Sequence, residues 1–261
     1  MNSYFIPLIL TLGAGMSTLL GGFITFFVKR DNLKALSVGL GFSAGVMVYV
    51  SLNELMREAP VMLNAYYGDI RSKALAFVGF AVGIVIAVII DYFIPDHIES
   101  DFLTTNKKIA QARRIKRAGL ITAIAVTLHN FPEGMATFLV SSQDLRLGVP
   151  VAIAIAIHNI PEGIAIALPI FHASGKKRLA ILYSFLSGIS EPIGGLLGVV
   201  LLRTIIPAQA VGIMTATVAG IMVYLSFDTL LPLAREYGEN HHVIIGIISG
   251  MLIMAFGLIF L

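Results

Sequence analysis

The heptapeptide LHNFPEG at residues 128–134 returns, changed at two positions, as IHNIPEG at residues 157–163. Each copy lies inside a run of apolar residues long enough to cross a lipid bilayer. Ionisable side chains at bilayer depth cost roughly 2.5–3.5 kcal/mol each on insertion scales, so they usually face a bundle interior and serve a function. The repeated set of histidine, asparagine, proline, glutamate and glycine therefore predicts a functional site within a membrane.

The composition is that of a membrane protein. Hydrophobic residues make up 57% of the 261 positions and charged residues only 13%, which is far below the charged fraction of soluble domains. The sequence contains no cysteine, which excludes disulfides and thiolate metal ligands. The pI near 9.2 does not indicate a nucleic-acid partner, because the basic residues form short blocks between apolar runs.

Apolar runs of roughly 20 residues predict an all-α polytopic membrane protein that forms one transmembrane domain over residues 1–261. The eight expected spans lie at about 4–28, 35–56, 74–94, 118–140, 149–171, 179–202, 207–232 and 243–261. The first run is expected to be retained as a helix, because the basic segment of a cleaved signal peptide does not precede it.

The distribution of lysine and arginine predicts the orientation of these spans. The loops after the first, third, fifth and seventh spans hold 13 basic residues, and the opposite side holds five. The positive-inside rule then places both termini outside the cytoplasm of a multi-pass protein in the cell (inner) membrane. The longest loop, residues 95–117, is cytoplasmic in this arrangement. We expect it to be a solvated connector, with a regulatory metal-binding loop as the alternative.

Three spans bring ionisable residues to the same depth. His129 is the midpoint of the fourth span, and His158 lies within one helical turn of the midpoint of the fifth. Glu191, in the segment SEPIGG, lies at the midpoint of the sixth span. These three spans are therefore predicted to share one site in the middle of the membrane.

The spacing within each motif directs its polar side chains toward one another. At about 3.6 residues per turn, Glu133 lies about 40° and Asn130 about 100° from His129 around the helix axis. The second motif repeats this arrangement with His158, Asn159 and Glu162. Nitrogen and oxygen ligands without sulfur favour borderline divalent cations such as Zn²⁺, Fe²⁺ and Mn²⁺, although spacing does not rank these ions or separate them from Co²⁺ and Cd²⁺.

A proline accompanies each set of ligands, namely Pro132, Pro161 and Pro192. A proline inside a helix removes one backbone hydrogen bond and pushes away the carbonyl of the preceding turn. We therefore expect a kink and a loose carbonyl beside each motif, together with a bare-backbone glycine at Gly134 and Gly163. Broken helices that meet at the membrane midplane are typical of transporter binding sites.

The motifs HNFPEG, HNIPEG and SEPIGG resemble those of the ZIP (Zrt/Irt-like) family of divalent metal transporters, in particular its bacterial ZupT-like branch. The resemblance extends over the whole chain in the number of spans, the outward termini and the longer loop after the third span. It implies import of zinc, and also of iron, manganese, cobalt or cadmium, by an elevator-like movement of spans 1, 4, 5 and 6 against the others. The metal is substrate rather than a resident cofactor, and a homodimer is left open.

The same resemblance implies a binuclear metal centre. The ligands of the first metal would be His129, Glu133, His158 and Glu162. Those of the second would be Asn130, Glu133, Asn159, Glu162 and Glu191, with the two motif glutamates bridging both ions.

Several polar residues outside the motifs have no assigned role: Asn53, Glu54, Asp228, His172, His241 and His242. The first two end the second span on the outer side, where they either receive metal or belong to the polar membrane interface. The aspartate lies deep enough in the seventh span to need a partner. The histidines lie on the cytoplasmic side, where an exit relay and ordinary solvated residues are the two interpretations.

An intramembrane metal-dependent hydrolase or protease is the main alternative to a transporter. Such enzymes place two histidines four residues apart with a glutamate base, as in HExxH, but the residue four after His129 is Glu133. A di-iron bundle requires Glu-x-x-His, and the order here is reversed. A carrier of organic substrates would need a more varied polar cavity. The sequence therefore favours metal transport over catalysis.

Overall fold

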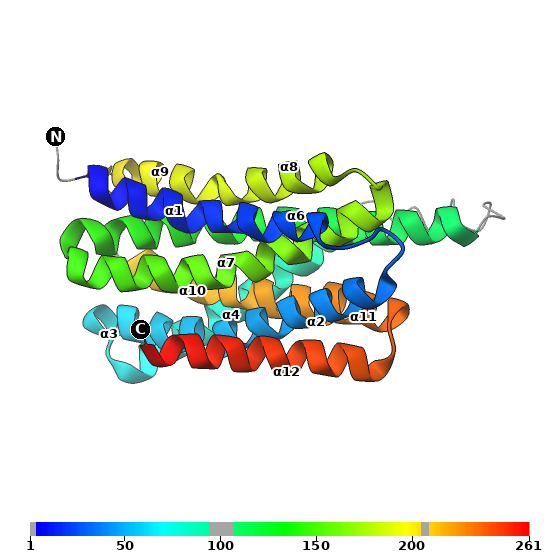
Figure 1. Cartoon of the computed structure of the whole chain (residues 1–261). Helices are drawn as coiled ribbons and strands as arrows, with labels where there is room; N and C mark the ends of the chain where they lie inside the picture. Colours follow the sequence, from blue (N-terminus) through cyan, green and yellow to red (C-terminus); the bar gives the residue numbers. More distant parts are fainter. Residues whose placement is uncertain (1–3, 94–106, 205–208, 261) are drawn as a thin grey trace.

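The computed structural model describes residues 4–93, 107–204 and 209–260, and every regular element in these ranges is a helix (Figure 1). Six helical segments among them are long and apolar enough to cross a membrane: Phe5–Phe26, Leu33–Tyr67, Asp69–Phe93, Leu145–Ser174, Lys177–Leu197 and Ala210–Tyr237. The chain is therefore a polytopic helical membrane protein. The count of eight spans and the orientation stay predictions.

Two of the predicted spans do not meet this length and hydropathy criterion. Helix α6 (Lys107–Gln143) carries the polar residues of LHNFPEG in the middle of its apolar run. Helix α12 (Asn240–Gly257) is apolar but contributes a segment shorter than the other six, His241–Gly257. A helix whose polar residues face a bundle interior loses mean hydropathy without losing its apolar outer surface.

The helices form two packed groups, which lie above and below one another in Figure 1. The motif group contains α1 (Phe5–Gly22), η1 (Phe23–Phe26), α6, α7 (Leu145–Ser174), α8 (Lys177–Gly188) and α9 (Ser190–Thr204). The flanking group contains α2 (Leu33–Val50), η2 (Ser51–Leu55), α3 (Met56–Tyr67), α4 (Asp69–Phe93), α10 (Gln209–Tyr224), η3 (Leu225–Leu230), α11 (Leu231–Tyr237), α12 and η4 (Leu258–Phe260). Both sequence motifs and Glu191 belong to the motif group.

The helix that contains the predicted second span, 35–56, is longer than that span. The helix continues from α2 through the π-helical turn η2 and α3 to Tyr67, and it stops at Gly68, whose φ is +74°. Charged residues interrupt the apolar run after Met56, but α3 still buries Ala59 and Leu63 completely against the flanking group. Tertiary burial of one helical face therefore extends the helix beyond the apolar run. In the same way the helix that contains the predicted seventh span, 207–232, continues to Tyr237.

The predicted loop 95–117 is partly helical. Residues 94–106 lie outside the described residues, but α6 begins at Lys107, eleven residues before the predicted start. This first part is rich in basic residues, which are good helix formers, and it also buries Ile115 in the core. Residues 107–117, which were predicted to end a polar connector, are thus the first turns of α6.

The expectation of broken helices is right for only one of the three segments. Helices α6 and α7 run without interruption through Pro132 and Pro161. The break instead separates α8 from α9 at Ile189, immediately before Glu191. Pro192 then falls in the first turn of α9, where backbone amides have no intrahelical acceptor and a proline is tolerated.

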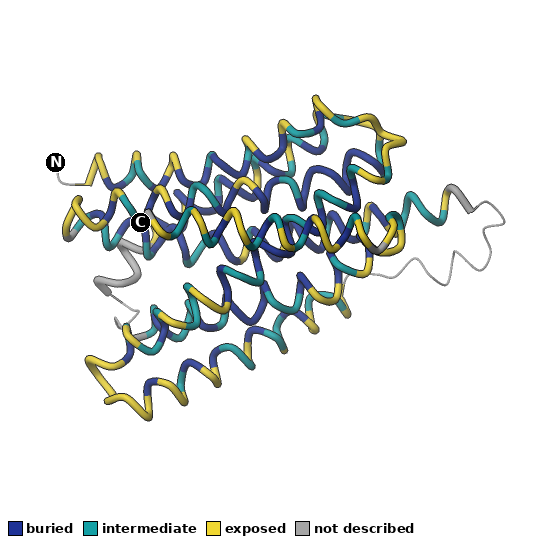
Figure 2. Tube along the Cα trace, turned by 60° about the horizontal axis from the view of Figure 1, so that its bottom comes forward, coloured by how far each residue is buried: buried dark blue, intermediate teal, exposed yellow. Residues whose placement is uncertain are grey.

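Buried residues follow the facing sides of the helices, as the dark segments of Figure 2 show. The largest apolar cluster draws mainly on α2, the N-terminal half of α6, the C-terminal half of α7, α10, η3 and α11. Its fully buried large side chains include Leu36, Leu40, Met47, Ile166, Leu168, Ile170 and Leu230. One end of the boundary between the two groups is therefore filled by close-packed apolar residues.

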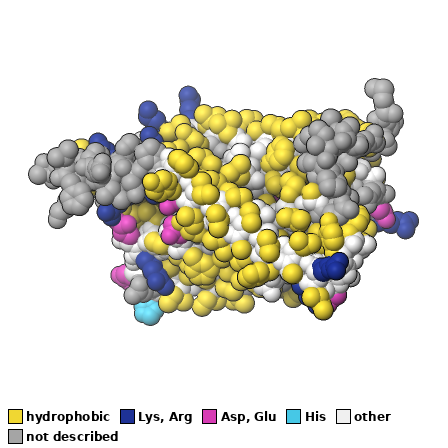
Figure 3. All heavy atoms as spheres, turned by 180° about the vertical axis from the view of Figure 1, so that it is seen from behind, with side chains coloured by type: hydrophobic (Ala, Val, Ile, Leu, Met, Phe, Trp, Pro, Cys, Tyr) yellow, Lys and Arg dark blue, Asp and Glu magenta, His cyan; other side chains and the backbone are white. Residues whose placement is uncertain are grey.

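The outer surface agrees with a membrane environment. On the face drawn in Figure 3, hydrophobic side chains cover the middle of the molecule, and the charged side chains gather at its two ends. Exposed apolar residues such as Phe77, Val85 and Ile89 of α4 contribute to this kind of surface. A soluble monomer rarely exposes so large an apolar area, whereas lipid contact accounts for it.

Glycine allows close helix contacts within each group. A side chain at Gly21 of α1 would collide with the carbonyl oxygen of Ile160 in α7, and one at Gly83 of α4 would collide with that of Thr217 in α10. Small residues that let backbones approach are the usual packing device between membrane helices. At Gly13, on the exposed side of α1, an added methyl group would meet no atom within 4 Å.

We predict that Gly21→Ala destabilises the protein by about 1–3 kcal/mol, because the added methyl group forces α1 away from α7. Gly13→Ala is the matched control on the same helix and is expected to be neutral or slightly stabilising. Thermal unfolding of both variants in detergent measures the difference. Equal transition temperatures would contradict the packing of α1 on α7.

Candidate metal centre

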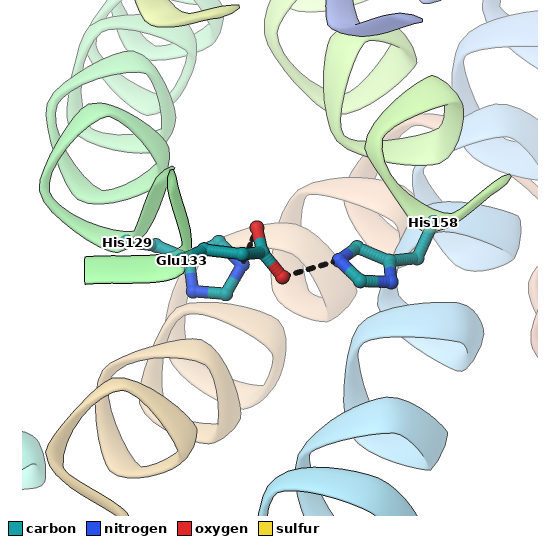
Figure 4. A group of neighbouring side chains, drawn as sticks. All are labelled: His129, Glu133 and His158. Atoms are coloured by element: carbon teal, nitrogen blue, oxygen red, sulfur yellow. Dashed lines mark hydrogen bonds and ion pairs between the residues drawn. The ribbon is translucent and has the colours of Figure 1, made fainter. Parts of the chain in front are cut away.

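Glu133 joins the two motifs. It lies one turn after His129 on α6, and its Oε2 atom is 3.3 Å from Nε2 of that histidine. Its other oxygen, Oε1, is 2.7 Å from Nε2 of His158 on α7. Figure 4 shows the carboxylate between the two imidazoles. Ligand atoms of these three residues all lie within 4.8 Å of one another, which is close enough to hold one metal ion.

Glu162 makes the reciprocal contact from α7. Its Oε1 atom is 3.1 Å from Nε2 of His129. Each motif glutamate therefore faces the histidine of the other motif, as expected when two antiparallel helices carry the same His-Asn-x-Pro-Glu pattern. His129, His158 and Glu162 are at most 1% exposed, and Glu133 is 9% exposed.

The two asparagines and Glu191 form a second, adjoining cluster. Asn159 donates from Nδ2 to Oε2 of Glu191 at 2.7 Å and to the backbone oxygen of Ala14 at 3.0 Å. Asn130 donates from Nδ2 to the backbone oxygen of Ser187, at 3.3 Å. Both amide nitrogens are thus held by the surrounding helices, and both amide oxygens remain available. All three side chains are completely buried.

The centre contains an excess of buried acceptors. Within the described part of the chain, the side-chain oxygens without a hydrogen-bond donor include Asn130 Oδ1, Asn159 Oδ1, Glu162 Oε2 and Glu191 Oε1. A buried polar atom without a partner costs about 1–3 kcal/mol, and more when it is charged. Several such oxygens in one place are stabilised by a cation. This arrangement therefore has the chemistry of a divalent-cation site.

The motif glycines have a different role from the one expected. A side chain at Gly134 would collide with the carbonyl oxygen of Glu191, and one at Gly163 with that of Thr18. They allow α9 and α1 to approach the motifs, rather than leaving bare backbone beside the ligands. The structure thus gives the motif glycines a packing role that was not predicted. The close approach at Gly134 is what brings Glu191 to the centre.

A cavity of about 500 Å³ leads to one side of this centre. His129, Glu133 and His158 line it, together with residues of η2, α3 and α10. The other four predicted ligands are absent from its lining, so the cavity reaches the histidine side first. In the opposite direction along α2, α6 and α7, the apolar core closes the boundary between the two helix groups. The centre is thus open toward α3 and closed toward α11.

Of the polar residues to which the sequence assigned no role, all but one lie away from the centre. Asn53 is exposed and bonds to Tyr49 in its own helix, and Asp228 is exposed in the π-helical turn η3. His172 lies ten residues beyond Glu162, about 15 Å along the helix. The other two histidines, His241 and His242, are in the first turn of α12. The exception is Glu54, which lines the cavity.

Sequence reasoning missed two kinds of residue. Arg57 and Glu58 line the cavity, but they follow the predicted end of the second span. The four-residue spacing from Glu54 to Glu58 was the available signal. The backbone oxygens of Ala14 and Ser187, which hold the asparagines, have no sequence signal.

Comparison with known proteins gives a consistent set of relatives. A family model described as "ZIP Zinc transporter" matches residues 96–257. A protein of Clostridium perfringens named Zinc transporter ZupT is 44% identical, covering 99% of this chain and 97% of its own. Proteins of the same name from Nitratidesulfovibrio vulgaris and Oceanobacillus iheyensis are 46% and 45% identical and cover 96% and 100% of this chain. They are matched over 95% and 100% of their own lengths.

We predict that Glu133→Ala sharply weakens zinc binding to the purified protein, because this carboxylate contacts both histidines. Glu239→Ala removes an exposed carboxylate outside the centre and is the matched control. Calorimetric titration of each variant with zinc measures the affinity. An affinity equal to that of the wild type would remove Glu133 from the centre.

Proposed function

Because the chain belongs to the ZIP family of zinc transporters, we propose that it carries divalent transition-metal cations, above all Zn²⁺, through the cell membrane into the cytoplasm. Members of this family are transporters and not enzymes, so the hydrolase alternative is set aside. The observation that carries the proposal is the buried set of imidazoles and unsatisfied oxygens at the end of a cavity.

The geometry supports a first cation position between His129, Glu133, His158 and Glu162. With zinc–ligand bonds of about 2.0–2.1 Å, two atoms of a tetrahedral shell lie about 3.3 Å apart. The distances from His129 Nε2 to the two glutamates, 3.3 and 3.1 Å, are close to this value. The 2.7 Å pair of Glu133 and His158 must separate by about 0.6 Å to admit zinc.

A second position adjoins the first, with Asn130, Asn159 and Glu191 as its own ligands and the two motif glutamates shared. The three glutamates carry at most three negative charges, whereas two divalent cations carry four positive charges. One bound cation leaves a net −1 and two leave +1. The number of carboxylates therefore makes double occupancy sensitive to the charge at the second position.

Import further requires that the closed end open, and we propose that the motif group moves against the flanking group. Backbone contacts at glycine lie within each group, as at Gly21 and Gly83. Across the boundary, Gly39 of α2 instead meets only side-chain atoms, including Leu168 Cδ1. Side chains repack more easily than helix backbones in direct contact. The boundary is thus the plane along which the helices can slide.

Polar contacts close this boundary at the α11 end and have to break when the end opens. Arg117 of α6 lies 3.2 Å from Asp91 of α4, and Arg114 of α6 lies 3.4 Å from Glu236 of α11. Beside the centre, Ser43 of α2 donates across the same boundary to the backbone oxygen of Pro161. The excess of lysine and arginine at the loops of this end supports its assignment to the cytoplasm.

We predict that His158→Ala or Glu162→Ala reduces zinc uptake by reconstituted vesicles to the level of empty vesicles. Each change removes a ligand of the first position. His241→Ala removes an exposed histidine outside the centre and should retain wild-type uptake. Uptake of radioactive zinc measures all three, and size-exclusion chromatography verifies folding. Wild-type transport by folded His158→Ala would refute the site.

We predict that Asn130→Asp raises the ratio of Mn²⁺ to Zn²⁺ uptake, because it supplies a fourth negative charge and a second-position carboxylate, which suits Mn²⁺. Asn64→Asp, at an exposed position of α3, adds the same charge away from the centre. Competition between the two metals in vesicles measures the ratio. Identical metal profiles for Asn130→Asp and the wild type would count against a second occupied position.

A further inference from the structure

Two acidic residues line the cavity that leads to the metal centre from the α3 end. Glu54 lies in the π-helical turn η2 and Glu58 one turn later in α3. Both line the 500 Å³ cavity that ends at Glu133, and both also line a neighbouring cavity of about 440 Å³. The two cavities therefore meet at this pair of carboxylates. Short π-helical turns are frequent at functional sites in proteins.

The walls between this pair and the centre are largely apolar. Of the described residues that line the larger cavity, only Glu54, Glu58 and Glu133 are acidic. The apolar ones include Val61, Met62, Ala136, Val140, Val151, Ile155 and Val218. Carboxylates in a cleft with apolar walls focus the electric field and raise the local concentration of cations.

One oxygen of the Glu54 carboxylate has no hydrogen-bond donor within the described part of the chain. This atom, Oε2, is buried. Glu133 lines the same cavity; its Oε2 accepts no hydrogen bond and lies 3.3 Å from Nε2 of His129, and that side chain is only 7% exposed. Carboxylate oxygens without a hydrogen bond thus occur at two residues that line one cavity.

Arg57 lies on the same stretch of helix and lines both cavities. With Glu54 and Glu58 it leaves this patch with a formal charge of −1. A patch with a small negative charge attracts a divalent cation without holding it as tightly as the centre, where imidazoles and three carboxylates converge. Release toward the centre is then favourable.

We propose that Glu54 and Glu58 form a capture site, which binds a partly hydrated divalent cation through carboxylate oxygens before the cation reaches His129, Glu133 and His158. The inference rests on the proposed transport function. It assigns the pair a binding role that is separate from the two positions of the centre. The site takes hard or borderline divalent cations that still carry water, since the cavity supplies few other ligands.

The test compares Glu54→Gln/Glu58→Gln with wild-type protein in vesicles, by initial rates of uptake over a range of zinc concentrations. We expect KM to rise roughly tenfold with kcat unchanged, because a charged cleft raises local cation concentration and association rates by about 10–10³. Asp69→Asn removes an exposed acid at the start of α4 that lines neither cavity and is expected to leave KM unchanged. The single variant Glu58→Gln serves if the double variant does not fold.

The outcomes separate this inference from the function on which it rests. An unchanged KM in Glu54→Gln/Glu58→Gln, while His158→Ala abolishes uptake, would overturn the capture site and leave metal transport standing. A lower kcat with unchanged KM would also overturn it, because the pair would then act in a conformational step. Absence of zinc uptake by the wild-type protein would overturn the proposed function and the capture site together.

Discussion

Glu133 and Glu162 each lie against the histidine of the opposite motif, and the rest of the structure holds these two reciprocal contacts in place. Carboxylates that are buried at bilayer depth need positive partners, since their desolvation is otherwise too costly. The antiparallel packing of α6 on α7 brings those partners together, and the approach of α9 at Gly134 adds Glu191. Even so, several oxygens stay without donors, and a divalent cation is the partner that would satisfy them.

Access to the centre is one-sided. The cavity reaches the histidine side from the end of α3, where Glu54 and Glu58 are also found, and the apolar core closes the other end. A cation that entered this way would meet carboxylates first, then imidazoles, and finally the amide oxygens and Glu191. The order follows from the helix positions alone, because residues 54–62 of the second helix line the cavity and residues 36–47 belong to the core.

The proposed change of access, from a centre open toward α3 to one open toward α11, would use the boundary between the two helix groups. Helices within a group approach at glycine and would move as a unit in the proposed movement, whereas the boundary is formed by apolar side chains, ion pairs and the hydrogen bond from Ser43. Packed interfaces of this kind tend to have discrete alternative arrangements rather than continuous deformation. All seven proposed ligands belong to the motif group, so a movement of that group would carry the centre intact.

Apolar run length and helical spacing are local properties, so the sequence alone predicts the membrane class, the helical character of the spans and the candidate residues of the centre. It did not determine that α3 and the start of α6 extend beyond the apolar runs, or that α6 and α7 continue through their prolines. Those features depend on which helical faces other helices bury. The contacts of Ala14 and Ser187 with the two amides, and the cavity that Glu58 shares with the centre, emerge from the packing of the helices, since contacts between distant segments leave no periodic signal in a single chain.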